Sequence, residues 1–172
     1  MLKYITILSI LILFSCSDDS ETGMNSNSDI NLNPGNMTAK VDGNDWKASQ
    51  GIVFAAISTI DSVSAMSVTA ARTVSATLSE GIGMALSNVL ATDQSLENTY
   101  NLDGTSIASL VFTKTTNGIS VTYAANSGMI EISEITQSYV KGTFNGVCVN
   151  QQNNSDSITI TDGKFNATLT GF

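Results

Sequence analysis

Acidic side chains are the first candidates for chemistry, because the chain contains no histidine. Two carboxylates can act together as acid and base when they flank the same substrate bond. Glu131 and Glu134 are three residues apart, which on a β-strand points them to opposite faces. Asp42 and Asp45 bracket a predicted turn, where acids usually serve the turn itself. Neither pair predicts a catalytic site, and we expect that the protein is not an enzyme.

The internal cysteine has a structural interpretation. Cys148 is in phase with Val140 and Phe144 along a predicted strand, so we expect it to behave as a small buried hydrophobic residue. A catalytic thiol needs a neighbouring base and an electropositive setting, and the sequence shows neither. With no histidine available as a ligand, we expect no metal and no cofactor.

The N-terminus has the pattern of an export signal. A cationic start, Met1 to Lys3, precedes an apolar run from Tyr4 to Phe14, which is too short for a membrane-spanning helix of about 20 residues. The next residues, Leu13-Phe14-Ser15-Cys16, resemble the bacterial lipobox. The resemblance implies a signal peptide over residues 1–15 and a lipid on Cys16. An ordinary signal peptide with a chance cysteine is the alternative.

Acids follow the cysteine directly. Ser17, Asp18, Asp19 and Glu21 resemble the acidic export signal of surface lipoproteins of the Bacteroidota. The resemblance implies a lipid anchor in the outer membrane with the protein displayed at the cell surface, and the periplasmic leaflet is the alternative. Residues 16–36 contain few apolar side chains and cannot offset their ordering entropy, so we interpret them as a flexible tether.

The remaining residues, 37–172, read as a single antiparallel β domain. From Met66 to Leu86 nearly every even position is apolar and the odd positions are small or hydroxyl-bearing, which is the period of a strand. The exceptions, Arg72 and Glu80-Gly81, are predicted turns or bulges. The pattern continues downstream and predicts about eight to ten strands. A two-sheet β-sandwich is the predicted fold, and a calycin-like barrel is the alternative.

Three dipeptides have the composition of tight turns. Asp42-Gly43, Asn117-Gly118 and Asp162-Gly163 each combine residues that tolerate positive φ, as two-residue hairpins require. We therefore expect a hairpin at each of them.

Several motifs resemble a group of small uncharacterised lipoproteins of the Bacteroidota. The C-terminal pieces are Gly128-Met129-Ile130-Glu131-Ile132, Val140-Lys141-Gly142-Thr143-Phe144 and Ile160-Thr161-Asp162-Gly163-Lys164-Phe165. The N-terminal piece runs from Ala39 to Ala48, and Thr99-Tyr100-Asn101-Leu102 resembles a further strand. Each motif is weak alone and their order is the stronger signal. The resemblance implies a fold and a cellular location, and carries over no catalytic residue.

Charge and aromatic content restrict the function. A net charge of −8 with seven scattered Lys and Arg argues against nucleic acid as a partner. Trp46 and Tyr139 are the candidate ligand-binding residues, although a lone Trp at a first hairpin more often closes a core. We expect a non-enzymatic binding or accessory module for glycan, peptide or a partner protein. The alternatives are a lipocalin-like carrier of a small apolar ligand and a structural envelope or adhesion protein.

Overall fold

The computed structural model describes residues 32–60, 63–89, 96–103 and 107–170, which form β-strands and turns. These described residues form ten strands, a number within the predicted range. They are β1 (Asn36–Val41), β2 (Asn44–Lys47), β3 (Val53–Ile60), β4 (Val63–Ser75), β5 (Leu78–Val89), β6 (Thr99–Asn101), β7 (Ala108–Thr116), β8 (Ile119–Ile135), β9 (Tyr139–Asn150) and β10 (Ser157–Leu169). None of the described residues forms a helix long and apolar enough to cross a membrane.

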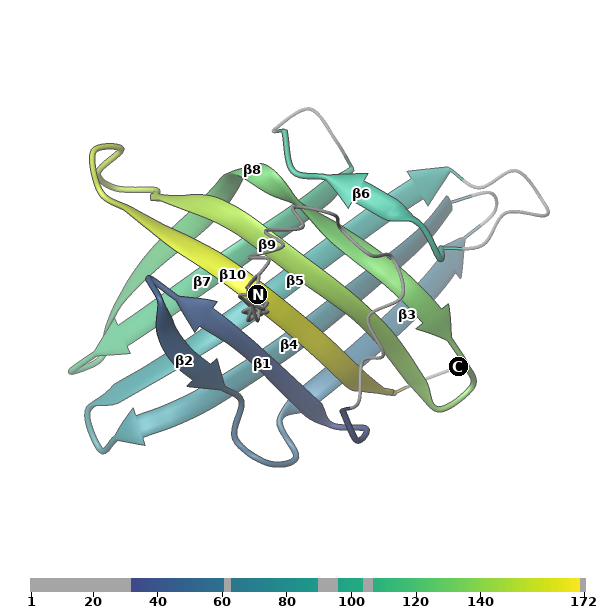
Figure 1. Ribbon diagram of the computed structural model, residues 1–172, viewed down its shortest axis with the longest axis horizontal. Coiled ribbons are helices and arrows are strands. Elements are labelled where there is room, and N and C mark those ends of the chain that lie inside the picture. The colour runs from purple at the N-terminus through teal and green to yellow at the C-terminus, as the bar shows by residue number, and fades with distance from the viewer. Residues whose placement is uncertain (1–31, 61–62, 90–95, 104–106, 171–172) are drawn as a thin grey trace, which may run out of the picture.

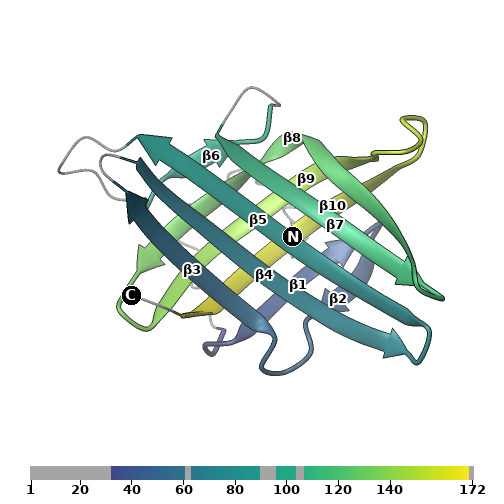
Figure 2. The ribbon, with the colours of Figure 1, turned by 180° about the vertical axis from the view of Figure 1, so that it is seen from behind.

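The strands close into a ring. Hydrogen bonds connect them in the order β3, β4, β5, β7, β8, β9 and β10, and β10 then pairs with β3. This last contact is parallel and short, joining Thr168 to Phe54 and Leu169 to Ala55, whereas the other pairings are antiparallel. The ring has two walls, one formed by β3, β4, β5 and β7 and the other by β1, β8, β9 and β10. Figures 1 and 2 show that the strands of the two walls cross. The all-β class is confirmed, but the ring is consistent with the calycin-like alternative and not with the predicted sandwich.

The β1–β2 hairpin lies beside β10, along the part of that strand that does not pair with β3. β1 pairs with β10 from Asn36 opposite Asn166 to Val41 opposite Ile160. The chain that follows β2 contacts β4, because Ser49 N donates to the Ala71 carbonyl at 2.9 Å. The hairpin therefore fills the wedge that the short β3–β10 contact leaves open.

Alternation along the strands fills the interior with apolar side chains. Inward residues of β4 and β5, such as Met66, Val68 and Met84, are at most 4% exposed. Leu110 of β7 and Ile130 of β8 meet them at 0% exposure. The barrel interior is therefore a packed core. The even-position alternation predicted for Met66 to Leu86 is confirmed along both strands, except that Val74, near the β4–β5 turn, is 50% exposed.

Glycines make room for two interior phenylalanines. Gly142 is paired with Phe165 and Gly163 with Phe144, and the two rings are 6.3 Å apart. A Cβ on Gly142 would be 2.5 Å from Phe165 Cζ. The Gly-Thr-Phe and Gly-Lys-Phe motifs are thus cross-strand pairs in which each ring covers the other strand's glycine.

Two of the three expected hairpin turns are confirmed. Asp42-Gly43 connects β1 to β2 and Asn117-Gly118 connects β7 to β8, with positive φ at all four residues. The expected hairpin at Asp162-Gly163 is wrong. That dipeptide lies inside β10, where the register shifts between Ile160 and Gly163 and Asp162 has a φ of 53°. The positive φ supports a β-bulge, because both neighbouring segments stay paired to β9.

Candidate functional site

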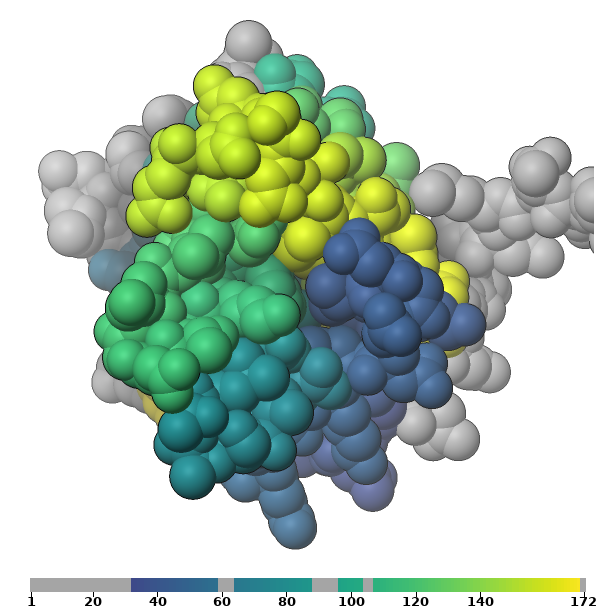
Figure 3. Space-filling view, turned by 90° about the vertical axis from the view of Figure 1, so that its left-hand side faces the viewer, coloured from purple at the N-terminus to yellow at the C-terminus, as the bar shows by residue number. Residues whose placement is uncertain are grey.

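One end of the barrel opens into a polar cup, which we call the mouth. The turns after β1, β4, β7 and β9 surround it, and Figure 3 looks onto this end, where the four segments enclose a central hollow. The hollow has a volume of about 370 Å³. Its lining is Val41, Asp42, Asn44, Arg72, Glu80, Phe112, Lys114, Tyr123, Asp156, Ser157 and Ile158.

An ion pair lies on one wall of the mouth. Arg72 of β4 stands directly opposite Glu80 of β5, and its Nε and Nη2 are each 2.8 Å from Glu80 Oε2. The side chains are 26% and 11% exposed, so much of the pair is shielded from water. Arg72 also donates from Nη1 to the Asp45 carbonyl at 3.2 Å. The prediction that these positions mark turns or bulges is wrong: Arg72 and Glu80 pair regularly within their strands, and the register shift lies between Thr73 and Ser75, just before the chain reverses.

A second cation, Lys114, lies in the same cross-strand row as Arg72 and Glu80. Lys114 of β7 is the cross-strand neighbour of Glu80 on the side away from Arg72. Its side chain is exposed, and it forms none of the ion pairs found among the described residues. Two cations therefore flank one carboxylate, and Lys114 has hydrogen-bond donors free for a ligand.

The adjoining wall carries a hydrogen-bonded carboxylate. Asp156 Oδ2 accepts from Tyr123 Oη and from Asn150 Nδ2, each at 2.9 Å. These bonds, from Asn150 first and Tyr123 second, lower the pKa of Asp156. Partial burial, followed by the hydrogen bond to Asp156, raises the pKa of Tyr123. Asp156 is thus held as an anion beside a neutral phenol.

A further acid stands on the rim formed by the first hairpin. Asp42 Oδ1 accepts a 2.8 Å hydrogen bond from Thr159 N, which ties the β1–β2 turn to β10. The Asp42 side chain also lines the hollow, together with Asn44 of β2. The cations thus come from the β4 and β7 side of the mouth, and the acids Asp42 and Asp156 come from the β1 and β10 side.

Trp46, one of the two predicted ligand-binding residues, belongs to the core. It is 1% exposed and cannot act as a stacking surface for a ligand. The Arg72 guanidinium carbon lies 5.7 Å from the ring centroid, so Trp46 supports the mouth from beneath. Burial of Trp46 agrees with the alternative that a lone Trp at the first hairpin closes the core.

Tyr139, the other predicted binding residue, is outside the mouth and already engaged. Its hydroxyl donates to Glu134 Oε1 at 2.8 Å, and Lys141 Nζ lies 4.7 Å from its ring centroid. Lys141 Nζ also contacts Glu134 Oε2 at 3.0 Å. Hydrogen bonds from Lys141 and then Tyr139 lower the pKa of Glu134. Tyr139 therefore belongs to a surface cluster whose polar groups satisfy one another.

Cys148 faces the interior at 0% exposure, as predicted. Desolvation raises the pKa of its thiol to about 12, so it stays protonated at neutral pH. The predicted lipidation residue Cys16 and the acidic signal, Ser17, Asp18, Asp19 and Glu21, lie outside the described residues.

The mouth can bind polar groups through several donors and acceptors. Lys114 offers donors, while Asp42 and the second oxygen of Asp156 offer acceptors. Phe112 and Ile158 give the lining an apolar part. Within the described ranges no group of three acidic, cysteine or histidine side chains is placed to hold a metal ion. The arrangement suits reversible binding of a small polar ligand.

Sequence reasoning missed most of the mouth. Arg72 and Glu80 occupy even positions, as do the apolar residues around them, so they point the same way as the core residues. Charged residues at such positions indicate that the interior of a barrel gives way to a polar opening. Tyr123 and Asp156 are 33 residues apart, and only the pairing of β8 with β9 brings them together. No sequence pattern marks that contact.

The strand ring, the packed interior and the polar mouth define a small all-β barrel domain with one polar open end. Residues 27–168 match the family described as Domain of unknown function (DUF5025), and the chain belongs to this family. No curated protein and no solved structure was found to match the chain.

Proposed function

We propose that this protein is a lipid-anchored binding module that holds a glycan in the barrel mouth without changing it chemically. The observation that carries the proposal is the hollow of about 370 Å³ in which Lys114 faces a ligand space shared with Asp42 and Asp156. Sugars present hydroxyls that donate and accept, together with apolar C–H faces. A mouth with donors, acceptors and an apolar floor matches both properties.

The packed core favours the mouth over the interior as the binding site. Phe144, Phe165 and Leu110 are at most 2% exposed and occupy the space that a lipocalin-like carrier would keep for an apolar ligand. The volume of the mouth is near the lower limit for ligand sites, about 300–1,000 Å³, so a short segment of a glycan fits it better than a large ligand does.

The chain enters the fold away from the mouth. Leu32, the first described residue, accepts a 2.7 Å hydrogen bond from Asn166 Nδ2. Asn166 lies toward the end of β10 that is distant from the mouth, since β10 begins at Ser157 beside it. Residues 32–36 are thus part of the folded domain, and a lipid on Cys16 with a tether leading to Leu32 would leave the mouth open to solvent.

The anchor and its location are tested in cells. We expect radiolabelled palmitate to label the full chain and the Cys16→Ser variant to lose the label. Protease added to intact cells should digest the domain if it is displayed at the cell surface, as we propose. Digestion only after the outer membrane is permeabilised would place it in the periplasmic leaflet instead.

Binding is tested with the full chain in detergent on an array of bacterial and host glycans, with a peptide array in parallel. We expect one glycan class to be retained and Lys114→Ala to weaken it at least about tenfold, because the ammonium is the free donor of the mouth. Lys47→Ala removes an exposed lysine of β2 that does not line the hollow, and it should bind as the wild type does.

Three results would contradict the proposal. Retention of peptides alone would replace the glycan with a peptide ligand. Equal binding by the Lys114→Ala variant would move the site away from the mouth. Cleavage of a retained glycan, lost in Glu80→Gln, would make the protein an enzyme.

A further inference from the structure

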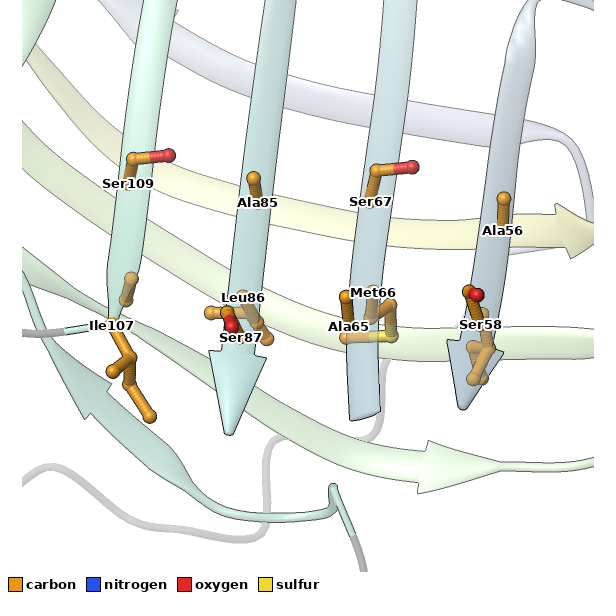
Figure 4. Close-up of a pocket in the computed structure, with 12 residues that line it drawn as sticks. Ala56, Ser58, Ala65, Met66, Ser67, Ala85, Leu86, Ser87, Ile107 and Ser109 are labelled. Carbon is orange, nitrogen blue, oxygen red and sulfur yellow. The ribbon is translucent and has the colours of Figure 1, made fainter. Parts of the chain in front are cut away.

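The outward face of β3, β4, β5 and β7, which we call the outer wall, is built from small side chains. Cross-strand pairing aligns Ala56, Ser67, Ala85 and Ser109 in one row. The next row contains Ser58, Ala65 and Ser87, and ends at Ile107, whose carbonyl accepts from Ser87 N. Figure 2 shows these four strands from outside, and Figure 4 shows the two rows in detail.

The outer wall carries no charge at its outward positions. Among the described residues of β3, β4, β5 and β7, these positions hold Ala, Gly, Ser or Thr, with Phe54 and Val111 as the exceptions. The opposite wall differs, since Lys40, Glu131, Lys141 and Lys164 occupy outward positions there. The chain has a net charge of −8, yet another protein can pack against this wall without removing a charged group from water.

The outer wall has both a hollow and a projection. The two small rows line a hollow of about 480 Å³, because neither Ala nor Ser fills the space above the strands. Phe54 projects from the adjacent row, opposite Thr69, with 43% of its surface exposed. The other end of the hollow is bounded by Ile107, which is 49% exposed. Because Phe54 and the hollow lie side by side on one face, a two-fold axis between two copies can place the Phe54 of each copy over the hollow of the other.

We propose that the outer wall is the interface of a homodimer in which Phe54 of each copy enters the hollow of the other. The area of the outer wall follows from strand geometry. Four strands about 4.8 Å apart set its width, nine residues at about 3.4 Å each set its length, and the wall therefore covers about 580 Å² per copy. The total of about 1,200 Å² is at the lower limit for a specific interface, so the dimer is expected to be weak and reversible. This inference is independent of ligand binding in the mouth.

The test is sedimentation equilibrium of the purified full chain in a density-matched detergent over a range of concentrations. We expect a concentration-dependent shift toward twice the mass of one chain. Because both copies are acidic, added salt should strengthen the association. Ala85→Glu places a charge in the middle of the wall and should weaken the dimer more than tenfold, and Phe54→Ala should weaken it without adding any charge.

Val147→Glu is the matched control. Val147 is 38% exposed on β9, in the opposite wall, so this variant adds the same charge at an apolar surface position and should dimerise as the wild type does. Circular dichroism establishes that each variant is folded. A chain that stays monomeric up to about 100 μM, or a dimer that persists unchanged in Ala85→Glu, would overturn the proposal.

Discussion

The guanidinium of Arg72 contacts a single carboxylate oxygen of Glu80 through both Nε and Nη2, each at 2.8 Å. The two residues are direct cross-strand partners at the end of an otherwise apolar face. The pair marks the boundary between the hydrophobic interior and the mouth, because it follows directly on the buried pair of Ala70 and Ile82 in the same strands. Its geometry also fixes the guanidinium near Trp46, which ties the mouth to the core.

We expect strong coupling between Arg72 and Glu80. In a double-mutant cycle with Arg72→Met and Glu80→Gln, the coupling free energy should exceed about 1.5 kcal/mol, since the pair is largely shielded from water. The exposed pair Lys40 and Asp162, 3.9 Å apart, is the control and should couple by less than about 0.5 kcal/mol. Urea unfolding measures both cycles. Equal coupling in the two pairs would contradict a structural role for the ion pair.

Gly142 is expected to be intolerant of any side chain. Gly142→Ala would place a Cβ against Phe165 and against the Glu131 carbonyl, and should destabilise the fold by about 2–3 kcal/mol. Gly81→Ala is the matched control, since its Cβ would meet only the Ala70 carbonyl at 3.4 Å and should change stability by less than about 0.5 kcal/mol. Thermal or urea unfolding compares them. A neutral Gly142→Ala would contradict the packing of Phe165 over Gly142.

The Cys148 thiol should be unreactive in the native protein. Its pKa of about 12 leaves very little thiolate near pH 8, and the side chain is buried. A thiol reagent such as DTNB should therefore label it only at the rate of unfolding. Val147→Cys, at an exposed neighbouring position, should label rapidly under the same conditions. Fast labelling of Cys148 in the folded wild type would contradict its placement.

Asp156 should contribute to the acid sensitivity of the fold. Because its pKa is lowered in the folded state, its contribution to stability is present above the ordinary carboxyl range and is lost as the pH falls through that range. Urea midpoints measured from about pH 7 to pH 3 should therefore decline less steeply in Asp156→Asn than in the wild type. Asp45→Asn, at an exposed position, controls for the loss of one acid. Parallel curves for Asp156→Asn and the wild type would contradict the prediction.

The class of fold could be predicted because period-two alternation depends only on neighbouring residues. The turns at Asp42-Gly43 and Asn117-Gly118 were predictable for the same reason. Barrel closure was not, since it depends on two residue pairs between β3 and β10 that are more than a hundred positions apart in the sequence. The bulge at Asp162 has the composition of a hairpin turn, and only its pairing with β9 distinguishes the two.

Ligand mapping by NMR is the most direct test of binding in the mouth. The isotope-labelled full chain is titrated with the glycan that the array retains most strongly. We predict that amide shifts concentrate at Glu80, Lys114, Tyr123 and Asp156 and that Lys114→Ala removes them. Shifts concentrated around Tyr139 or on the outer wall, with the mouth unchanged, would contradict the account.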